Sequence, residues 1–343
     1  MSWVDGGDNL NKVSVSPSKM DRIKQLSNND NVIAALAIDQ RGSLKSMLAT
    51  ADLTKEVDQT IVEFKKLVSK ELTNFSSSIL LDPEYGLAAA NVRAETSGLL
   101  LAYEKTGYDA TKQGRLPDLL DDWSVHRLKN KGADAVKFLL YYDPDETESI
   151  NIMKHVFMER IGAECKALDM PFFLEIVTYD ANNSDIKGAD YAKVKPYKVI
   201  NAMKEFSKAE YFVDVLKVEV PVNMNYVEGF NSADQEVVYT TAEAMAFFKE
   251  QSESTHIPFI FLSAGVSMNL FKETLKFAKR AGSTFNGVLC GRATWKDSAS
   301  IFSQDGEDQT KEWLQSKGRD NIESLNDILK ETATSWTDYY IVE

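Results

Sequence analysis

The sequence predicts an α/β protein and, within that class, a (β/α)8 TIM barrel with extra N- and C-terminal helices. Short apolar runs alternate with longer amphipathic stretches along the whole chain, which is typical of βα units around a parallel sheet. Eight such runs occur, and polar residues lie at or just after the end of each run. The length of 343 residues suits a single barrel, since such barrels span about 200 to over 400 residues.

The predicted strands are short, apolar and rich in β-branched residues. In chain order they are Val32–Ile38, Ser77–Leu81, Leu99–Tyr103, Ala135–Tyr141, Pro171–Val177, Val213–Val220, Pro258–Leu262 and Gly287–Cys290. The amphipathic stretches between them predict helices at Val57–Leu72, Trp123–Asn130, Ile150–Leu168, Tyr191–Phe206, Thr241–Gln251 and Leu270–Arg280. No glycine-rich dinucleotide fingerprint follows the first strand, which disfavours an open doubly wound sheet. We predict one barrel domain over residues 21–343 after an N-terminal extension, residues 1–20, to which we assign no function.

The composition excludes several classes of function. The formal net charge is −13 and no basic block occurs, so we expect no nucleic-acid partner. No apolar run approaches the roughly 20 residues of a membrane span, and the first twenty residues have no apolar core of a secretion signal. Two cysteines are too few for a disulfide framework. We therefore expect a cytoplasmic protein with no membrane partner, and a homodimer, which is the commonest oligomer.

Lys217 is the most informative residue of the chain. It lies in the run from Tyr211 to Pro221, which resembles a strand buried on both faces. Burial removes water from an ammonium group and so favours the neutral amine. A neutral lysine is a nucleophile that forms a Schiff base with a ketone. The structural alternative is a lysine that extends from a strand end to solvent, or one that is held in an ion pair.

Two further charged residues belong to the predicted strands. Alternation places Lys217 on the same face as Val213, Val215 and Glu219. If this face lines the barrel, Lys217 lies near Lys137 of the fourth strand and Glu175 of the fifth. Two lysines held close together disfavour each other's charged form, and Glu175 can carry protons if it reaches the substrate. The alternative for Lys137 and Glu175 is a buried ion pair without a catalytic role.

Polar segments at the strand ends predict where a site would lie. In a (β/α)8 barrel the active site forms at the carboxyl ends of the strands, and phosphate sites favour the loops after strands seven and eight. The segments include Asp39–Gly42, Asp82–Gly86, Tyr103–Gly107, Ser263–Gly265 and Cys290–Arg292. Each of them alone could be a turn or a helix cap. Polar ends on all eight strands favour a functional site.

These segments resemble class I tagatose 1,6-bisphosphate aldolases. The resemblance is carried by Leu36–Gly42, Leu80–Gly86, Leu101–Tyr108, Asp134–Tyr142, Phe172–Ile176, Leu216–Pro221, Leu262–Val266, Gly287–Trp295 and Ala333–Trp336. It runs from about Ile23 almost to the C-terminus. It implies cleavage of D-tagatose 1,6-bisphosphate to dihydroxyacetone phosphate and D-glyceraldehyde 3-phosphate, in lactose and galactose catabolism by the tagatose 6-phosphate pathway.

The resemblance also implies a role for individual residues. Lys217 corresponds to the lysine that forms the Schiff base, and Glu175 corresponds to the acid/base. The implied substrate-binding residues are Asp39, Gln40 and Lys137 around the sugar, and Ser263, Gly291 and Arg292 around one phosphate. For the second phosphate, Arg41 and Lys105 are the candidates.

We expect no metal and no other cofactor. A zinc-dependent aldolase would need several histidines at strand ends, whereas His126, His155 and His256 lie far apart and lack ligand spacing.

Three alternative functions stay open. A related Schiff-base aldolase could act on fructose 1,6-bisphosphate, which differs only at C4, or on a sulfonated sugar phosphate. The others are a sugar-phosphate sensor or interaction protein on the same scaffold, and an isomerase or epimerase without a covalent lysine.

Overall fold

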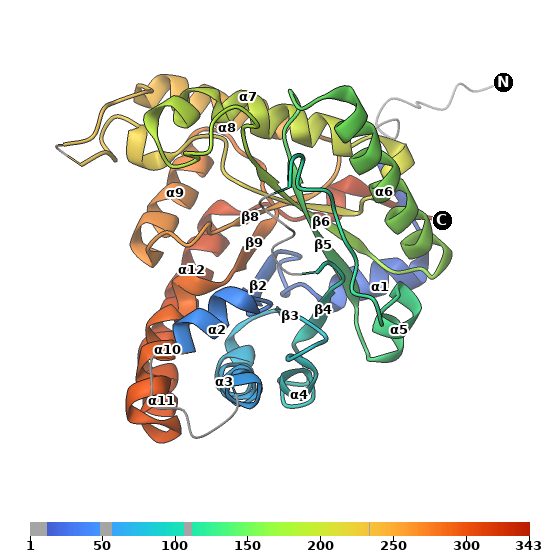
Figure 1. The fold of residues 1–343 in the computed structure, drawn as a ribbon, viewed down its shortest axis with the longest axis vertical. Helices are drawn as coiled ribbons and strands as arrows, with labels where there is room; N and C mark the ends of the chain where they lie inside the picture. The colour runs from blue at the N-terminus through green and yellow to red at the C-terminus, as the bar shows by residue number, and fades with distance from the viewer. Residues whose placement is uncertain (1–11, 49–56, 106–111, 233) are drawn as a thin grey trace.

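A closed barrel of eight parallel strands forms the centre of the molecule (Figure 1), which confirms the predicted (β/α)8 fold. The computed structural model describes residues 12–48, 57–105, 112–232 and 234–343. The strands pair in chain order and are β2 (Ile33–Ala37), β3 (Ser78–Leu81), β4 (Gly98–Ala102), β5 (Ala135–Tyr142), β6 (Phe172–Thr178), β7 (Val215–Val218), β8 (Phe259–Leu262) and β9 (Gly287–Cys290). Each overlaps the strand that the sequence predicts.

Helices surround the barrel and confirm the predicted pattern, with extra helices at both ends of the chain (Figure 1). They are α1 (Pro17–Gln25), α2 (Gly42–Leu48), α3 (Val57–Leu72), α4 (Leu87–Ala90), α5 (Val125–Asn130), α6 (Glu148–Ala167), α7 (Ala189–Phe206), α8 (Thr241–Glu253), α9 (Met268–Arg280), α10 (Arg292–Asp305), α11 (Glu307–Trp313) and α12 (Arg319–Thr332). No helix in the described part of the chain is long and apolar enough to cross a membrane.

Strand alternation divides the core into two layers. Inward-facing side chains such as Leu100, Phe173 and Val215 fill the barrel interior, while the outward-facing ones pack against the helices. Both faces of a parallel strand are therefore buried, which explains the continuous apolar runs. The register places Glu175 of β6 beside Lys217 of β7. The two charged residues thus occupy the inner face above the apolar layer.

The two ends of the chain close the amino-terminal end of the barrel together. A short strand, β1 (Val13–Val15), pairs in parallel with β10 (Tyr340–Val342). Helix α1 packs its apolar face on the inner layer, and Lys19 forms an ion pair of 2.9 Å with Asp214. The sequence analysis did not predict β1 or β10. Helix α1 also spans residue 20, where we placed the end of the extension, and that division of the chain stays a prediction.

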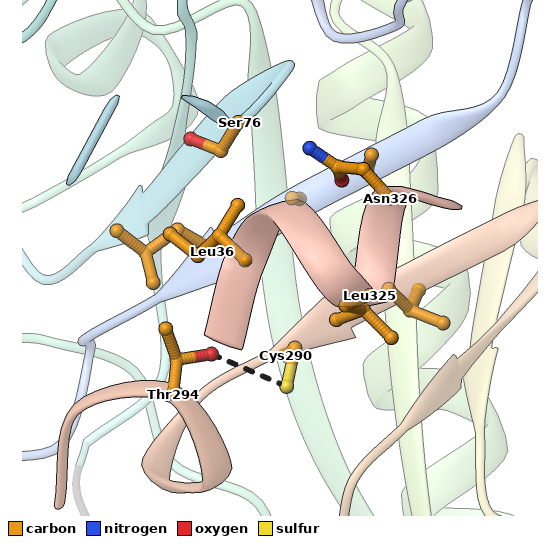
Figure 2. Close-up of a pocket in the computed structure, with 10 residues that line it drawn as sticks. Leu36, Ser76, Cys290, Thr294, Leu325 and Asn326 are labelled. Atoms are coloured by element: carbon orange, nitrogen blue, oxygen red, sulfur yellow. Dashed lines mark hydrogen bonds between the residues drawn. The ribbon is translucent and has the colours of Figure 1, made fainter. Parts of the chain in front are cut away.

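A small cavity of about 10 Å³ lies outside the barrel, between β2, β9 and α12 (Figure 2). Its lining includes Cys290, whose thiol faces the hydroxyl of Thr294 at 3.4 Å. Burial raises the pKa of Cys290 to about 11. The cavity holds about one water, so it is far too small for a sugar phosphate. The buried thiol with its raised pKa suits a packing role rather than that of a nucleophile.

We predict that Gly287→Ala destabilises the barrel where β9 pairs with β2. Gly287 has φ 138°, and a Cβ there would lie 2.0 Å from the carbonyl oxygen of Ile33. Left-handed strain and overpacking together should cost roughly 3 kcal/mol. Gly282→Ala is the control, because Gly282 has φ 81° but no atom within 4 Å of an added Cβ. Thermal unfolding of both variants tests this, and equal midpoints would contradict it.

Candidate active site

The ammonium group of Lys137 is the centre of a buried cluster at the carboxyl ends of the strands. Its Nζ lies 2.9 Å from Asp39, 2.7 Å from Glu104 and 2.7 Å from Glu175. Asp39 and Glu104 each follow a strand by two residues, β2 and β4 respectively, while Lys137 and Glu175 lie within β5 and β6. An ammonium has three N–H donors, and the three carboxylates occupy all of them.

Lys217 has a different environment from Lys137. Its Nζ lies 2.8 Å from Oε1 of Glu175, and Glu175 is the one carboxylate paired with it in the described structure. The other oxygen of Glu175, Oε2, contacts Lys137. The Lys217 side chain is only 5% exposed. One carboxylate therefore bridges the two lysines that the sequence analysis singled out.

The charges of this cluster shift its pKa values in different directions. Burial would lower the pKa of Lys137, but Asp39, Glu104 and Glu175 together raise it well above its usual value. Burial would raise the pKa of Asp39 and of Glu175, but Lys137 and Lys217 hold both pKa values below their usual range. Lys137 is therefore fixed as an ammonium and cannot be the nucleophile. Lys217, next to a single ionised carboxylate, is the amine with a nearby proton acceptor.

Glu104 is the site residue to which the sequence analysis gave no role. Burial raises its pKa, and neither Lys137 nor Arg41 fully offsets the effect. The signal was present, because Glu104 follows β4 by two residues just as Asp39 follows β2. Glu219 is the opposite case, since it pairs with Lys195 and Thr178 outside the cluster. The expectation that Val213 and Glu219 share a face with Lys217 was wrong. Strand β7 spans only Val215–Val218, so alternation does not extend to either residue, and Val213 packs in the outer apolar layer.

The loops after β8 and β9 form a second group at the same end of the barrel. Ser263 is buried and is followed by Ala264 and Gly265, which have positive φ angles of 49° and 76°. A Cβ on Gly265 would lie 3.2 Å from the guanidinium of Arg292, so the two loops touch. A left-handed alanine is strained, and such strain is concentrated at ligand sites.

Gly291 lies between this loop and Gln40. A Cβ on Gly291 would approach the carbonyl oxygen of Ala37 to 3.2 Å and Nε2 of Gln40 to 3.4 Å. Helix α10 begins at the next residue, Arg292, and the N-terminus of a helix attracts anions. Gln40, Ser263, Gly291 and Arg292 can therefore surround one phosphate, as the sequence analysis predicted for the last three.

Both residues that we considered for the second phosphate have carboxylate partners. Arg41 is buried, with one nitrogen 2.5 Å from Glu84 and another donating to the carbonyl oxygen of Glu104 at 2.6 Å. Lys105 pairs with Asp118 at 3.1 Å and with Asp121 at 2.8 Å. Each would have to leave a carboxylate partner in order to bind a substrate phosphate.

No group of three or more His, Cys, Asp or Glu residues in the described part of the chain is arranged to hold a metal ion. The expected absence of a metal or other cofactor stays a prediction. The lysine–carboxylate arrangement itself can form a covalent imine through Lys217 and move a proton through Glu175, and Arg292 can neutralise a phosphate.

A barrel with a buried lysine–carboxylate cluster at the carboxyl ends of its strands fits an aldolase. The chain belongs to the DeoC/LacD family of aldolases, since the model of that family matches residues 33–297. It is 60% identical over 324 residues to tagatose 1,6-diphosphate aldolase 2 of Enterococcus faecalis, which covers 94% of this chain and 97% of the relative. It is 58% identical to a tagatose 1,6-diphosphate aldolase of Staphylococcus aureus, with coverage of 94% and 99%.

Solved structures confirm the fold independently. Fructose-bisphosphate aldolase from Plasmodium falciparum has a TM-score of 0.65 at 16% identity, over 95% of this chain and 99% of that one. A Schiff base-forming fructose-1,6-bisphosphate aldolase has a TM-score of 0.56 at 12% identity, over 90% and 99%. At these identities the likeness shows the fold alone.

We predict that Lys137→Met destabilises the protein by about 3–5 kcal/mol, because it leaves buried carboxylates without their counter-charge. Their folded-state pKa values would then lie above the unfolded values of about 4. The variant therefore loses stability as the pH rises from the unfolded-state pKa to the folded-state pKa of these carboxylates. Its unfolding temperature should fall further below that of the wild type at pH 7.5 than at pH 5.

Two further variants make this measurement specific. Glu104→Gln in the Lys137→Met background removes one uncompensated charge and should restore part of the lost stability. Lys105→Met removes a lysine from an ion pair in which the lysine is 36% exposed and its partners more so, and it should change the unfolding temperature little at either pH. A deficit of Lys137→Met that is independent of pH would contradict the electrostatic explanation.

Proposed function

We propose that this protein cleaves D-tagatose 1,6-bisphosphate to dihydroxyacetone phosphate and D-glyceraldehyde 3-phosphate through a Schiff base on Lys217. The observation that carries the proposal is the pair of buried lysines that share Glu175, one fixed as an ammonium and the other next to a single carboxylate. The names of relatives at 58–60% identity support the choice of substrate.

In the proposed reaction, Nζ of Lys217 attacks the C2 carbonyl and Glu175 carries the protons that leave the amine and reach the departing hydroxyl. The protonated imine withdraws electrons from C3. Removal of the C4 hydroxyl proton then breaks the C3–C4 bond, which releases glyceraldehyde 3-phosphate and leaves an enamine. Protonation at C3 and hydrolysis of the imine return Lys217 and release dihydroxyacetone phosphate.

The remaining cluster residues would hold the substrate during these steps. Asp39 would accept a hydrogen bond from a sugar hydroxyl, and Lys137 would donate to the sugar in place of one of its carboxylate partners. Gln40 lies beside the phosphate loop. Ser263, Gly291 and Arg292 would bind the phosphate on C1. Because tagatose and fructose bisphosphates differ only at C4, relative cleavage rates of the two sugars would define the preference.

We further propose that the enzyme acts in the cytoplasm, in lactose and galactose catabolism, and as a homodimer. Two buried free thiols, Cys165 and Cys290, suit a reducing compartment. The dimer rests on the frequency of that state among soluble oligomers, and light scattering of the purified protein tests it.

We predict that dihydroxyacetone phosphate followed by borohydride forms one stable adduct, on Lys217, with loss of cleavage activity. Reduction converts the imine to a secondary amine that peptide mass spectrometry locates. The experiment is done in EDTA, so that a contaminating metal-dependent aldolase contributes nothing. Lys217→Met should abolish both adduct and activity, whereas Lys105→Met should retain both. An adduct on Lys137, or cleavage without any adduct, would contradict the mechanism.

A further inference from the structure

Arg115 is a cation near the barrel rim with no carboxylate partner among the residues that the structure describes. Its guanidinium carbon lies 3.4 Å from the centroid of the Tyr141 ring. Its Nε is buried and has no hydrogen-bond partner. The side chain as a whole is partly exposed. Arg115 thus differs from Arg41 and Lys105, each of which forms an ion pair with a carboxylate.

The ring under Arg115 belongs to the inner face of the barrel. Tyr141 lies on β5 four residues after Lys137, so the two side chains share a face about 13 Å apart along the strand. In the closed order of eight strands, β5 stands opposite β9, and Arg292 follows β9 directly. The two arginines therefore stand on opposite sides of the mouth of the barrel.

The backbone that carries Arg115 is held in a strained conformation. Gly114 and Arg115 have consecutive positive φ angles of 81° and 44°, and a left-handed arginine costs about 1–2 kcal/mol. The carbonyl oxygen of Gly114 accepts a hydrogen bond from the Tyr179 hydroxyl at 3.3 Å. That hydroxyl also contacts Glu146 and Lys154, each at 3.0 Å. A buried network thus fixes the turn, and strain that is held in this way is typical of binding sites.

The contact with the Tyr141 ring orients the guanidinium of Arg115 so that its N–H groups can bind an anion in the guanidinium plane. A guanidinium that lies flat on a ring keeps its N–H edge free in its own plane, and that edge matches the oxygens of a phosphate bidentately. We propose that Arg115 binds the substrate phosphate distal to the Schiff base, which is the phosphate on C6. This inference rests on the proposed function and makes Arg115 the residue that selects ketose bisphosphates over ketose 1-phosphates.

The test compares kcat/KM for tagatose 1,6-bisphosphate with kcat/KM for tagatose 1-phosphate. Arg115→Met should lower the first on the order of 100-fold, as expected for loss of hydrogen bonds to a charged group, and leave the second nearly unchanged. Arg115→Lys keeps the charge without the fork and should recover part of the loss. Lys105→Met is the matched control and should retain full discrimination. Unfolding temperatures of all three variants show whether the barrel is intact.

The outcomes separate this inference from the function on which it rests. Borohydride trapping with dihydroxyacetone phosphate does not involve the distal phosphate, so Arg115→Met should form the Lys217 adduct as wild type does. The role of Arg115 is overturned if Arg115→Met forms the adduct but keeps the wild-type preference for the bisphosphate over the 1-phosphate. It is also overturned if kcat/KM falls equally for both substrates. If wild-type protein forms no adduct and cleaves neither sugar, the proposed function itself fails.

Discussion

The ammonium group of Lys137 neutralises the carboxylates that are buried inside this barrel, and the polar site depends on it. Three carboxylates converge on it, two from residues that follow β2 and β4 and one from within β6, and each of their side chains is at most 13% exposed. Buried carboxylates without a counter-charge would neutralise or separate. Because Lys137 bonds to all three, it fixes the relative position of Asp39, Glu104 and Glu175. The position of Glu175 next to Lys217 therefore depends on the ion pair between Glu175 and Lys137.

The charges of the cluster also suit a cationic covalent intermediate. Three carboxylates face two lysines, and burial together with Asp39 raises the pKa of Glu104. The protonated imine on Lys217 would carry one positive charge beside Glu175, the carboxylate that already contacts Nζ of Lys217. The low-dielectric interior then does not oppose formation of the intermediate.

The sequence sufficed to predict those parts of the structure whose signals are local. Each barrel strand is an apolar run with a polar end, so the eight strands, Lys137, Glu175 and Lys217 could be placed from the chain alone. The pairing of β1 with β10 could not, because Val13–Val15 has no pattern of its own and its partner lies more than 300 residues away. Glu104 was within reach of the same reasoning, since its position after β4 repeats that of Asp39 after β2.

The second phosphate illustrates why the remaining part of the site needed coordinates. Position after a strand singles out Arg41 and Lys105, yet whether a cation can bind a ligand depends on which carboxylates already surround it. Arg41 and Lys105 are paired with acids that the sequence does not place beside them. Arg115 lies in a turn with no strand signal, and it becomes a candidate only through its stacking on Tyr141. In a protein with a net charge of −13, the charge of the whole molecule does not attract a phosphate group, so binding depends on a local cation that no carboxylate neutralises.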